Sequence, residues 1–265
     1  MICSTRLALC FLAVVLFAPS ALTDESEEAA DAGQYSNRTE YYLNELDWVR
    51  PEANWRELIA GYLPDFEVKY SQGFEELVIR DFFRGRKGGV YVDVGCWLPR
   101  RNSTTYFLER HLEWSGIAID AAAYLEKNWT RFRANTKFFA YAVTDVDGET
   151  ITFHLADALS SIDQEQAESF GNTSRAVEVP TITLTTLLDQ NGVEKIDFLS
   201  MDIEGGEPGA LAGFDIERFR PELVCVEKLA NTKALKDYFV AHGYEIVERY
   251  EKVDKINWYF QPKKD

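Results

Sequence analysis

The stretch Gly89-Val90-Tyr91-Val92-Asp93-Val94-Gly95 decides the fold. Its apolar and β-branched residues are typical of a strand that is buried on both faces, as the strands of parallel sheets are. The stretch ends in a glycine, which lets the backbone turn sharply and lets a ligand approach closely. Because ligands of open α/β sheets bind beyond the carboxyl ends of the strands, this stretch predicts a central strand whose end faces a ligand.

Strands and helices alternate from Gly88 onwards, as judged from the spacing of the apolar residues. The expected strands are 90–95, 116–120, 137–144, 150–155, 196–203, 223–227, 245–250 and 256–260. The expected helices are 74–83, 104–112, 124–133, 183–191, 208–214 and 232–242, and residues 159–175 are expected to form a loop. This alternation indicates βαβ units and a mostly parallel sheet, with 150–155 as an antiparallel addition and the last two strands as a hairpin.

The first residues differ from the rest of the chain. Arg6 precedes an apolar stretch at 7–22, which is shorter than the roughly 20 residues of a comfortable membrane span. Small residues follow the apolar centre, as at a signal peptidase site. We therefore expect 1–23 to be a signal peptide for export, with an uncleaved anchor on a cytoplasmic-facing protein as the alternative. An acidic linker at 24–40 would then lead into one domain at 41–265, which begins with a helical extension.

Composition bounds the partners and the redox chemistry. The chain of 265 residues has a net charge of −16 and a pI near 4.7. Proteins bind nucleic acids largely through Lys and Arg, so this charge argues against DNA or RNA as the main partner. Cys96 and Cys225 fall at strands with one strand between them, about 10 Å apart, and we expect two buried thiols and no disulfide.

The end of a second strand carries an acid that could bind a nucleoside. Residues 116–120 end in Asp120, and an acid at this place commonly accepts hydrogen bonds from both ribose hydroxyls. A solvated turn residue is the alternative interpretation. Dinucleotide-binding turns have the pattern G-x-G-x-x-G, but Gly95 is followed by Cys96, Trp97, Leu98 and Pro99. The missing glycines argue against a nicotinamide-dependent oxidoreductase.

The strongest local signal is Asp197-Phe198-Leu199-Ser200-Met201-Asp202-Ile203-Glu204-Gly205. Alternation along this expected strand would place Asp202 and Glu204 on one face, near its carboxyl end. Two carboxylates so close repel each other, so at least one is expected to meet a cation or to act as a protonated acid. A capping pair at the turn before the next helix is the alternative. No metal is predicted, because no His or Cys spacing supports one; a metal-assisted site would need Asp202 and Glu227 to converge.

Taken in order, these stretches resemble the FkbM-type methyltransferases over residues 71–262. The matching segments are Ser71-Gln72-Gly73, Tyr91-Val92-Asp93-Val94-Gly95, 102–109, 114–120, 182–184, 196–205, 220–227 and 257–260. The resemblance implies a Rossmann-like class I methyltransferase fold of the α/β class. Its central, mostly parallel seven-stranded sheet has the order 3-2-1-4-5-7-6 and is flanked by helices. It also implies S-adenosylmethionine as the cofactor and a hydroxyl group on a carbohydrate or natural product as the acceptor.

The resemblance further implies roles for individual residues at the site. Asp93 and Gly95 would line the methionine end of the cofactor, and Asp120 would hold the ribose. Asp202 and Glu204 would face the sulfonium and the acceptor, where one of them would serve as the catalytic base.

Five more residues of this chain are implied to bind the cofactor. Ala142 and Val143, with Asp145 just beyond them, would flank the adenine. Ser71 and Gln72 would cover the cofactor from the N-terminal side.

Two functions therefore compete at this point. The first is O-methylation of a small-molecule or glycan acceptor, which follows from the acids at the strand ends and from the resemblance. The second is an exported, non-catalytic binding protein that keeps the fold. It is motivated by the apparent signal peptide, because S-adenosylmethionine is expected inside cells, and by Trp97, which could pack over the cofactor or block it. Membrane contact is expected only if the N-terminal segment stays uncleaved.

Overall fold

The computed structural model describes residues 70–171, 173–228 and 232–264. The signal peptide or anchor at 1–23, the acidic linker at 24–40 and the helical extension at 41–63 lie outside the described residues and stay predictions. Within the part of the chain that the structure describes, no helix combines the length and the apolar character needed to cross a membrane.

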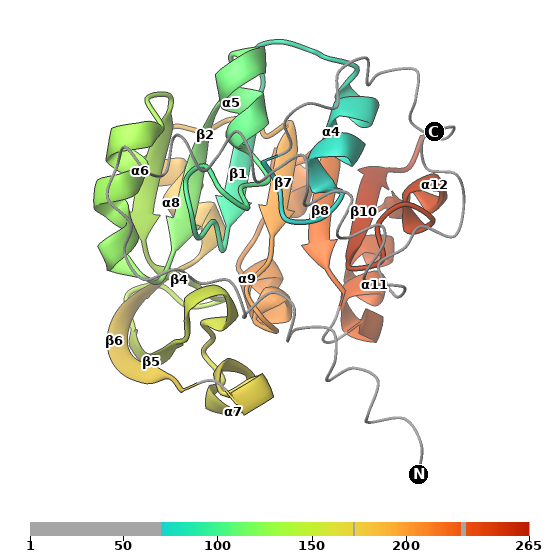
Figure 1. Cartoon of the computed structure of the whole chain (residues 1–265). Coiled ribbons are helices and arrows are strands. Elements are labelled where there is room, and N and C mark those ends of the chain that lie inside the picture. The colour runs from blue at the N-terminus through green and yellow to red at the C-terminus, as the bar shows by residue number, and fades with distance from the viewer. Residues whose placement is uncertain (1–69, 172, 229–231, 265) are drawn as a thin grey trace.

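Seven strands form the main sheet, in the order β3-β2-β1-β7-β8-β10-β9 (Figure 1). Their bounds are β1 Val90–Val94, β2 Ser115–Asp120, β3 Thr136–Ala140, β7 Phe198–Met201, β8 Leu223–Glu227, β9 Tyr244–Ile246 and β10 Asn257–Pro262. The first five strands of this order pair in parallel, and β10 is antiparallel to both of its neighbours. Counted within this sheet alone, the order is 3-2-1-4-5-7-6, which is the order that the resemblance implies. The winding reverses between β1 and β7, where sheets of this kind bind ligands.

Helices cover both faces of β1, which explains why four of its five residues are apolar. Val92 and Val94 pack into one apolar cluster together with side chains from α8, α9 and α11. Tyr91 points to the opposite face and packs with side chains from α4 and α5. The bounds of the helices are α4 Glu75–Phe83, α5 Tyr106–Leu112, α6 Glu126–Phe132, α8 Leu184–Gln190, α9 Glu207–Ala212, α10 Ile216–Phe219, α11 Thr232–Ala241 and α12 Glu248–Glu251.

A second, three-stranded sheet has the order β4-β6-β5, with β4 Ala142–Val143, β5 Thr150–Leu155 and β6 Arg175–Ile182. The prediction of one strand at 137–144 is therefore wrong, because β3 and β4 belong to different sheets. The predicted loop at 159–175 contains the short helix α7 Gln164–Ala167 and leads into β6. Burial alternates along β6, but Pro180 obscures the strand signal, since proline is uncommon inside sheets.

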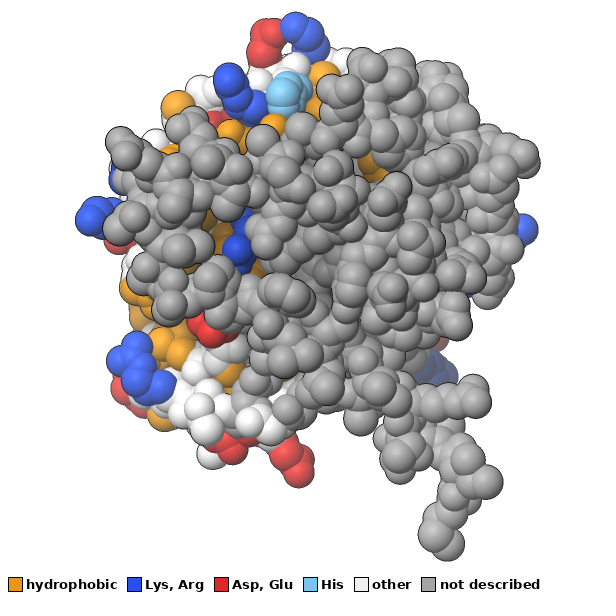
Figure 2. Space-filling view, viewed as in Figure 1, with side chains coloured by type: hydrophobic (Ala, Val, Ile, Leu, Met, Phe, Trp, Pro, Cys, Tyr) orange, Lys and Arg blue, Asp and Glu red, His pale blue; other side chains and the backbone are white. Residues whose placement is uncertain are grey.

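Acidic side chains are exposed at the lower end of the molecule, where Figure 1 places α7 (Figure 2).

The C-terminal strands are antiparallel neighbours, as expected, but they are not joined by a simple hairpin. The predicted strand at 245–250 is wrong beyond Ile246, where the chain turns into α12. The turn buries Tyr250, whose hydroxyl donates to the Asp81 carboxylate at 2.6 Å. This contact with α4 overrides the local preference for an extended chain.

Both cysteines of the described domain are free and buried, as expected. Cys96 follows β1 and Cys225 lies in β8, with β7 between the two strands. Burial raises the pKa of both thiols well above the usual range.

Candidate active site

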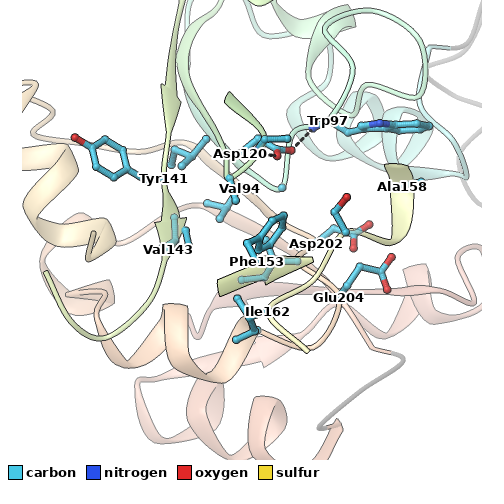
Figure 3. Close-up of a pocket in the computed structure, with 18 of the residues that line it drawn as sticks. Val94, Trp97, Asp120, Tyr141, Val143, Phe153, Ala158, Ile162, Asp202 and Glu204 are labelled. Carbon is cyan, nitrogen blue, oxygen red and sulfur yellow. Dashed lines mark hydrogen bonds between the residues drawn. The ribbon is translucent and has the colours of Figure 1, made fainter. Parts of the chain in front are cut away.

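A pocket opens at the carboxyl ends of β1, β2 and β7, where the winding of the sheet reverses (Figure 3). The space between its walls is about 670 Å³, which includes space open to solvent. The small sheet contributes β4 and Phe153 to the wall, and the segment at 157–162 contributes four further residues. Both sheets therefore shape one site.

The turn after β1 requires a glycine at position 95. Gly95 has a φ of +81°, and a Cβ there would lie 1.8 Å from the backbone oxygen of Asp202. The turn after β1 thus touches the turn after β7 and brings the ends of both strands to one wall. Gly95 lines the pocket, as the sequence predicts for the ligand-facing end of β1.

Asp120 lies at the pocket too, at the end of β2. Its carboxylate accepts hydrogen bonds from the backbone N–H groups of Trp97 at 3.0 Å and Ala122 at 2.8 Å. Burial raises its pKa to about 6, although these two hydrogen bonds favour the charged form. A carboxylate can accept about four hydrogen bonds, so Asp120 is fixed in place and still has room for the two hydroxyls of a ribose.

Trp97 forms part of the pocket wall (Figure 3). Its φ is +41°, and its backbone oxygen accepts a hydrogen bond from the indole N–H of Trp129 at 2.8 Å. The pocket is present with Trp97 in its lining. The structure therefore gives no support to the interpretation that this side chain blocks the site.

Three carboxyl groups meet where β7 and β8 end. Asp202 follows β7, Glu204 lies two residues further on, and Glu227 is the last residue of β8. Oxygens of the three groups lie within 4.8 Å of one another. The expected convergence of Asp202 and Glu204 is present, but strand alternation is the wrong reason. β7 ends at Met201, and Glu204 joins the group through a turn in which its φ is +52°.

Burial, and then the charges of neighbouring acids, raise the pKa of all three carboxyl groups. Burial raises the pKa of Glu204 to about 7, against a hydrogen bond from Gln166 Nε2 at 2.8 Å that lowers it. Asp202 faces the solvent of the pocket, yet the protein around it and then the charge of Glu204 raise its pKa well above the usual range. Burial and the charge of Asp202 do the same for the pKa of Glu227. Oxygens at this spacing could also hold a metal ion, but an acidic cluster alone does not assign one.

Four of the predicted cofactor residues are not among the described residues that line the pocket. The Ser71 hydroxyl instead accepts a hydrogen bond from the backbone N–H of Glu76 at 3.1 Å, at the start of α4. Asp93 is buried and accepts from the Thr105 hydroxyl at 2.7 Å. Gln72 is half-buried beside Ser71, and Asp145 is exposed beyond β4. The Ser71 hydroxyl and the Asp93 carboxylate are thus engaged in hydrogen bonds within the protein, although the resemblance implies that both contact the cofactor.

The remaining predicted residues do meet at the pocket, joined by others that the sequence did not indicate. Ala142 and Val143 line it from β4, as expected for an adenine wall. Tyr124 and Phe153 line it as well, and Gln166 reaches Glu204 from α7. Phe153 and Gln166 could not be found from the sequence, because the position of the small sheet and of the segment between β5 and β6 depends on β6, which the pattern did not reveal.

The charged residues of the lining share one sign. Among the described residues these are Asp120, Asp157, Asp202 and Glu204, and no Lys or Arg accompanies them. Such a wall favours a cationic ligand and disfavours the pyrophosphate of a dinucleotide, which binds through glycine-rich turns and positive dipoles. The carboxylate of Asp120 and the apolar wall at Ala142 suit a nucleoside, and the acids at the end of β7 suit a positive charge attached to it.

The sequence profile of the methyltransferase FkbM domain matches residues 88–246, more than half of the chain. No curated protein sequence matches the chain. Among solved structures, it is similar to a TehB-like SAM-dependent methyltransferase from Corynebacterium glutamicum (12% identity, 86% of this chain and 99% of that chain covered, TM-score 0.42). It is also similar to an O-methyltransferase from Bacillus cereus in complex with SAH (15% identity, 89% and 97% covered, TM-score 0.35). These structural similarities are low, and the family profile decides: the chain belongs to the methyltransferase FkbM domain family.

Proposed function

We propose that this protein transfers the methyl group of S-adenosylmethionine to a hydroxyl oxygen of a carbohydrate or natural-product acceptor. The observation that carries the proposal is that the acidic residues in the described lining of the pocket at the switch point of the sheet have no basic partner there, and that one of them, Glu204, has a pKa raised to about 7. S-adenosylmethionine combines a nucleoside with a positively charged sulfur, which is the combination that these walls suit.

Each part of the pocket has a role in holding this cofactor. Asp120 would accept the ribose hydroxyls, and Ala142 and Val143 would pack against the adenine. Gly95 leaves the turn after β1 free of a side chain, and Asp202, which also lines the pocket, would lie near the cationic sulfur. When bound, the cofactor supplies an electrophilic methyl group on a positively charged sulfur.

Glu204 is the residue best suited to remove the acceptor proton. Its carboxylate would accept the proton of the acceptor hydroxyl as the oxygen becomes a nucleophile. A base is most effective when its pKa lies near the working pH, and the pKa of Glu204 is raised to about 7. Gln166 Nε2 donates to one carboxylate oxygen of Glu204, and Glu204 lines the pocket.

Cofactor binding is the direct test of this function. We expect the wild-type protein to bind S-adenosylmethionine in a calorimetric titration and Asp120→Asn to bind it about 10- to 100-fold more weakly, since a charge-assisted hydrogen bond contributes about 1.5–3 kcal/mol. Asp145→Asn is the matched control, because Asp145 is exposed and lies outside the described lining. A folded wild-type protein that binds no S-adenosylmethionine would instead favour the non-catalytic alternative.

The pH dependence of the rate tests the base. Since Glu204 must be deprotonated to accept a proton, we expect the rate to rise as the pH increases through about 7 and then to level off. Gln166→Leu removes a hydrogen bond that lowers this pKa, so the rising limb should move to higher pH. Gln164→Leu is the control, because Gln164 bonds the exposed Glu168 instead. A limb that stays in place in Gln166→Leu would rule out Glu204 as the titrating base.

A further inference from the structure

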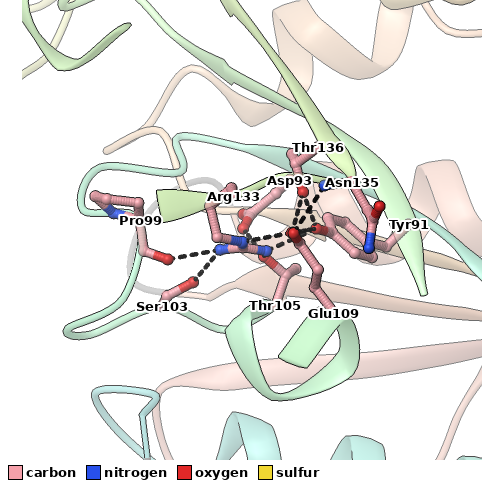
Figure 4. Close-up of polar contacts among 9 residues, drawn as sticks. All are labelled: Tyr91, Asp93, Pro99, Ser103, Thr105, Glu109, Arg133, Asn135 and Thr136. Carbon is pink, nitrogen blue, oxygen red and sulfur yellow. Dashed lines mark hydrogen bonds and ion pairs between the residues drawn. The ribbon is translucent and has the colours of Figure 1, made fainter. Parts of the chain in front are cut away.

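A fully buried arginine stands directly behind the turn that follows β1. Arg133 comes immediately after α6 and is 1% exposed. Its guanidinium has five N–H groups, and the structure gives five hydrogen bonds from it (Figure 4). Every N–H group of the guanidinium side chain thus has a partner within the protein.

Three of these bonds go to one segment, the turn at 96–105. Arg133 Nη1 donates to the backbone oxygen of Pro99 at 2.7 Å and to the hydroxyl of Ser103 at 3.2 Å. Nη2 donates to the hydroxyl of Thr105 at 3.1 Å, which in turn donates to the buried carboxylate of Asp93. Arg133 therefore holds the segment at its middle, through Pro99 and Ser103, and at its end, through Thr105.

The other two bonds fix the arginine itself. Its Nε donates to Glu109 Oε2 at 2.6 Å, and Nη2 donates to the Tyr91 hydroxyl at 2.6 Å. The negative charge of Glu109 balances the buried guanidinium, and the rings of Tyr91 and Trp129 lie beside it. Arg133 therefore ties the turn to β1 and α5, which are rigid parts of the fold.

Helix α6 holds the same turn at a second place. The indole N–H of Trp129, one helical turn before Arg133, donates to the backbone oxygen of Trp97 at 2.8 Å. Trp97 is the residue whose backbone N–H binds the Asp120 carboxylate and whose side chain forms part of the pocket wall. The contacts of α6 thus reach the pocket through one residue.

The turn needs this support because of its own sequence. Trp97 and Asn102 have φ values of +41° and +56°, a backbone region that glycine adopts freely and other residues adopt at a cost. After Gly95, no glycine relieves this strain within the turn. A buried ion pair is a poor source of stability compared with apolar packing, so its value here lies in the geometry that it imposes.

We infer that Arg133 is a positioning residue for the cofactor: with Trp129, it holds the glycine-poor turn at 96–105 in the shape that the pocket requires. The inference rests on the proposed function, since it concerns the affinity for the same cofactor. It assigns to α6, which contributes none of the described residues of the pocket lining, a part in cofactor binding.

Binding of S-adenosylhomocysteine by folded variants tests the inference. Arg133→Lys keeps the charge but loses most of the five bonds, and we expect its Kd to rise at least about 10-fold. Trp129→Phe keeps an aromatic ring and loses one neutral hydrogen bond, so we expect a rise of about 2- to 10-fold. Arg131→Lys, on the exposed side of the same helix, should change the Kd less than about 2-fold.

Calorimetry should be run at a temperature where circular dichroism shows each variant to be fully folded. A purely structural role would lower the melting temperature but leave the Kd of the folded protein unchanged, and that result in Arg133→Lys and Trp129→Phe would overturn the inference. If Arg133→Lys does not fold, Ser103→Ala, which removes a single contact, takes its place beside Trp129→Phe. Failure of the wild-type protein to bind S-adenosylhomocysteine would refute the proposed function itself, whereas normal binding by the variants would refute only the role of Arg133.

Discussion

Glu204→Gln is expected to lower kcat for methyl transfer by about 10²- to 10⁴-fold, the usual contribution of a general base. The amide has nearly the shape of the carboxylate and can still accept the hydrogen bond from Gln166, so the turn after β7 should keep its conformation. It cannot accept a proton from the acceptor. Since Glu204 is 8% exposed among other acids, removing its charge should also relieve repulsion, and the variant should be no less stable than the wild-type protein.

The measurement is the initial rate of S-adenosylhomocysteine release with a panel of hydroxylated glycosides. Glu165→Gln is the matched control, because Glu165 is an exposed glutamate on α7 that lies near the same segment without reaching the pocket. An unchanged kcat in Glu204→Gln would mean that another group, or the acceptor itself, handles the proton. In that case the raised pKa of Glu204 would reflect burial alone.

Gly95→Ala should destabilise the domain by about 2–6 kcal/mol, which adds the cost of a positive φ to that of overpacking. The new Cβ would lie 1.8 Å from the Asp202 carbonyl oxygen, so β1 and β7 would have to move apart where the pocket forms. For a domain of this size, we expect the melting temperature to fall by about 5–20 °C, as measured by circular dichroism.

Gly148→Ala separates the two contributions. Gly148 has a φ of +74°, close to that of Gly95, but a Cβ there meets no atom within 4 Å. It should therefore cost only the backbone term, about 1–3 kcal/mol. Equal losses in the two variants would show that the contact between the turns after β1 and β7 is looser than the structure indicates.

The sequence predicts correctly those strands and strand ends whose burial shows in the composition of a single segment. Burial makes β1 and β2 mostly apolar, and Asp120 stands out because it ends the apolar run of β2. Asp202 is recognisable for the same reason after β7. Ser71 was assigned to the cofactor on a short matching segment, but a hydroxyl next to a helix start finds a backbone N–H more readily than a ligand.

The parts that could not be predicted depend on several distant segments at once. The partners of Arg133 come from β1, from the turn after it and from α5, and no spacing near position 133 reflects them. Glu227 joins the acids only because β8 pairs with β7 in one particular register. The wall formed by Phe153 likewise requires β6, a strand that pairs β5 on one side and β4 on the other.

The two buried thiols have a consequence for the conditions in which the domain can fold. Disulfide exchange proceeds through the thiolate, and burial holds the pKa of Cys96 and Cys225 well above the usual range, so both sulfurs stay protonated and shielded. The described domain therefore neither gains a cross-link under oxidising conditions nor loses one under reducing conditions. In the native domain both thiols should therefore be protected from exchange with glutathione.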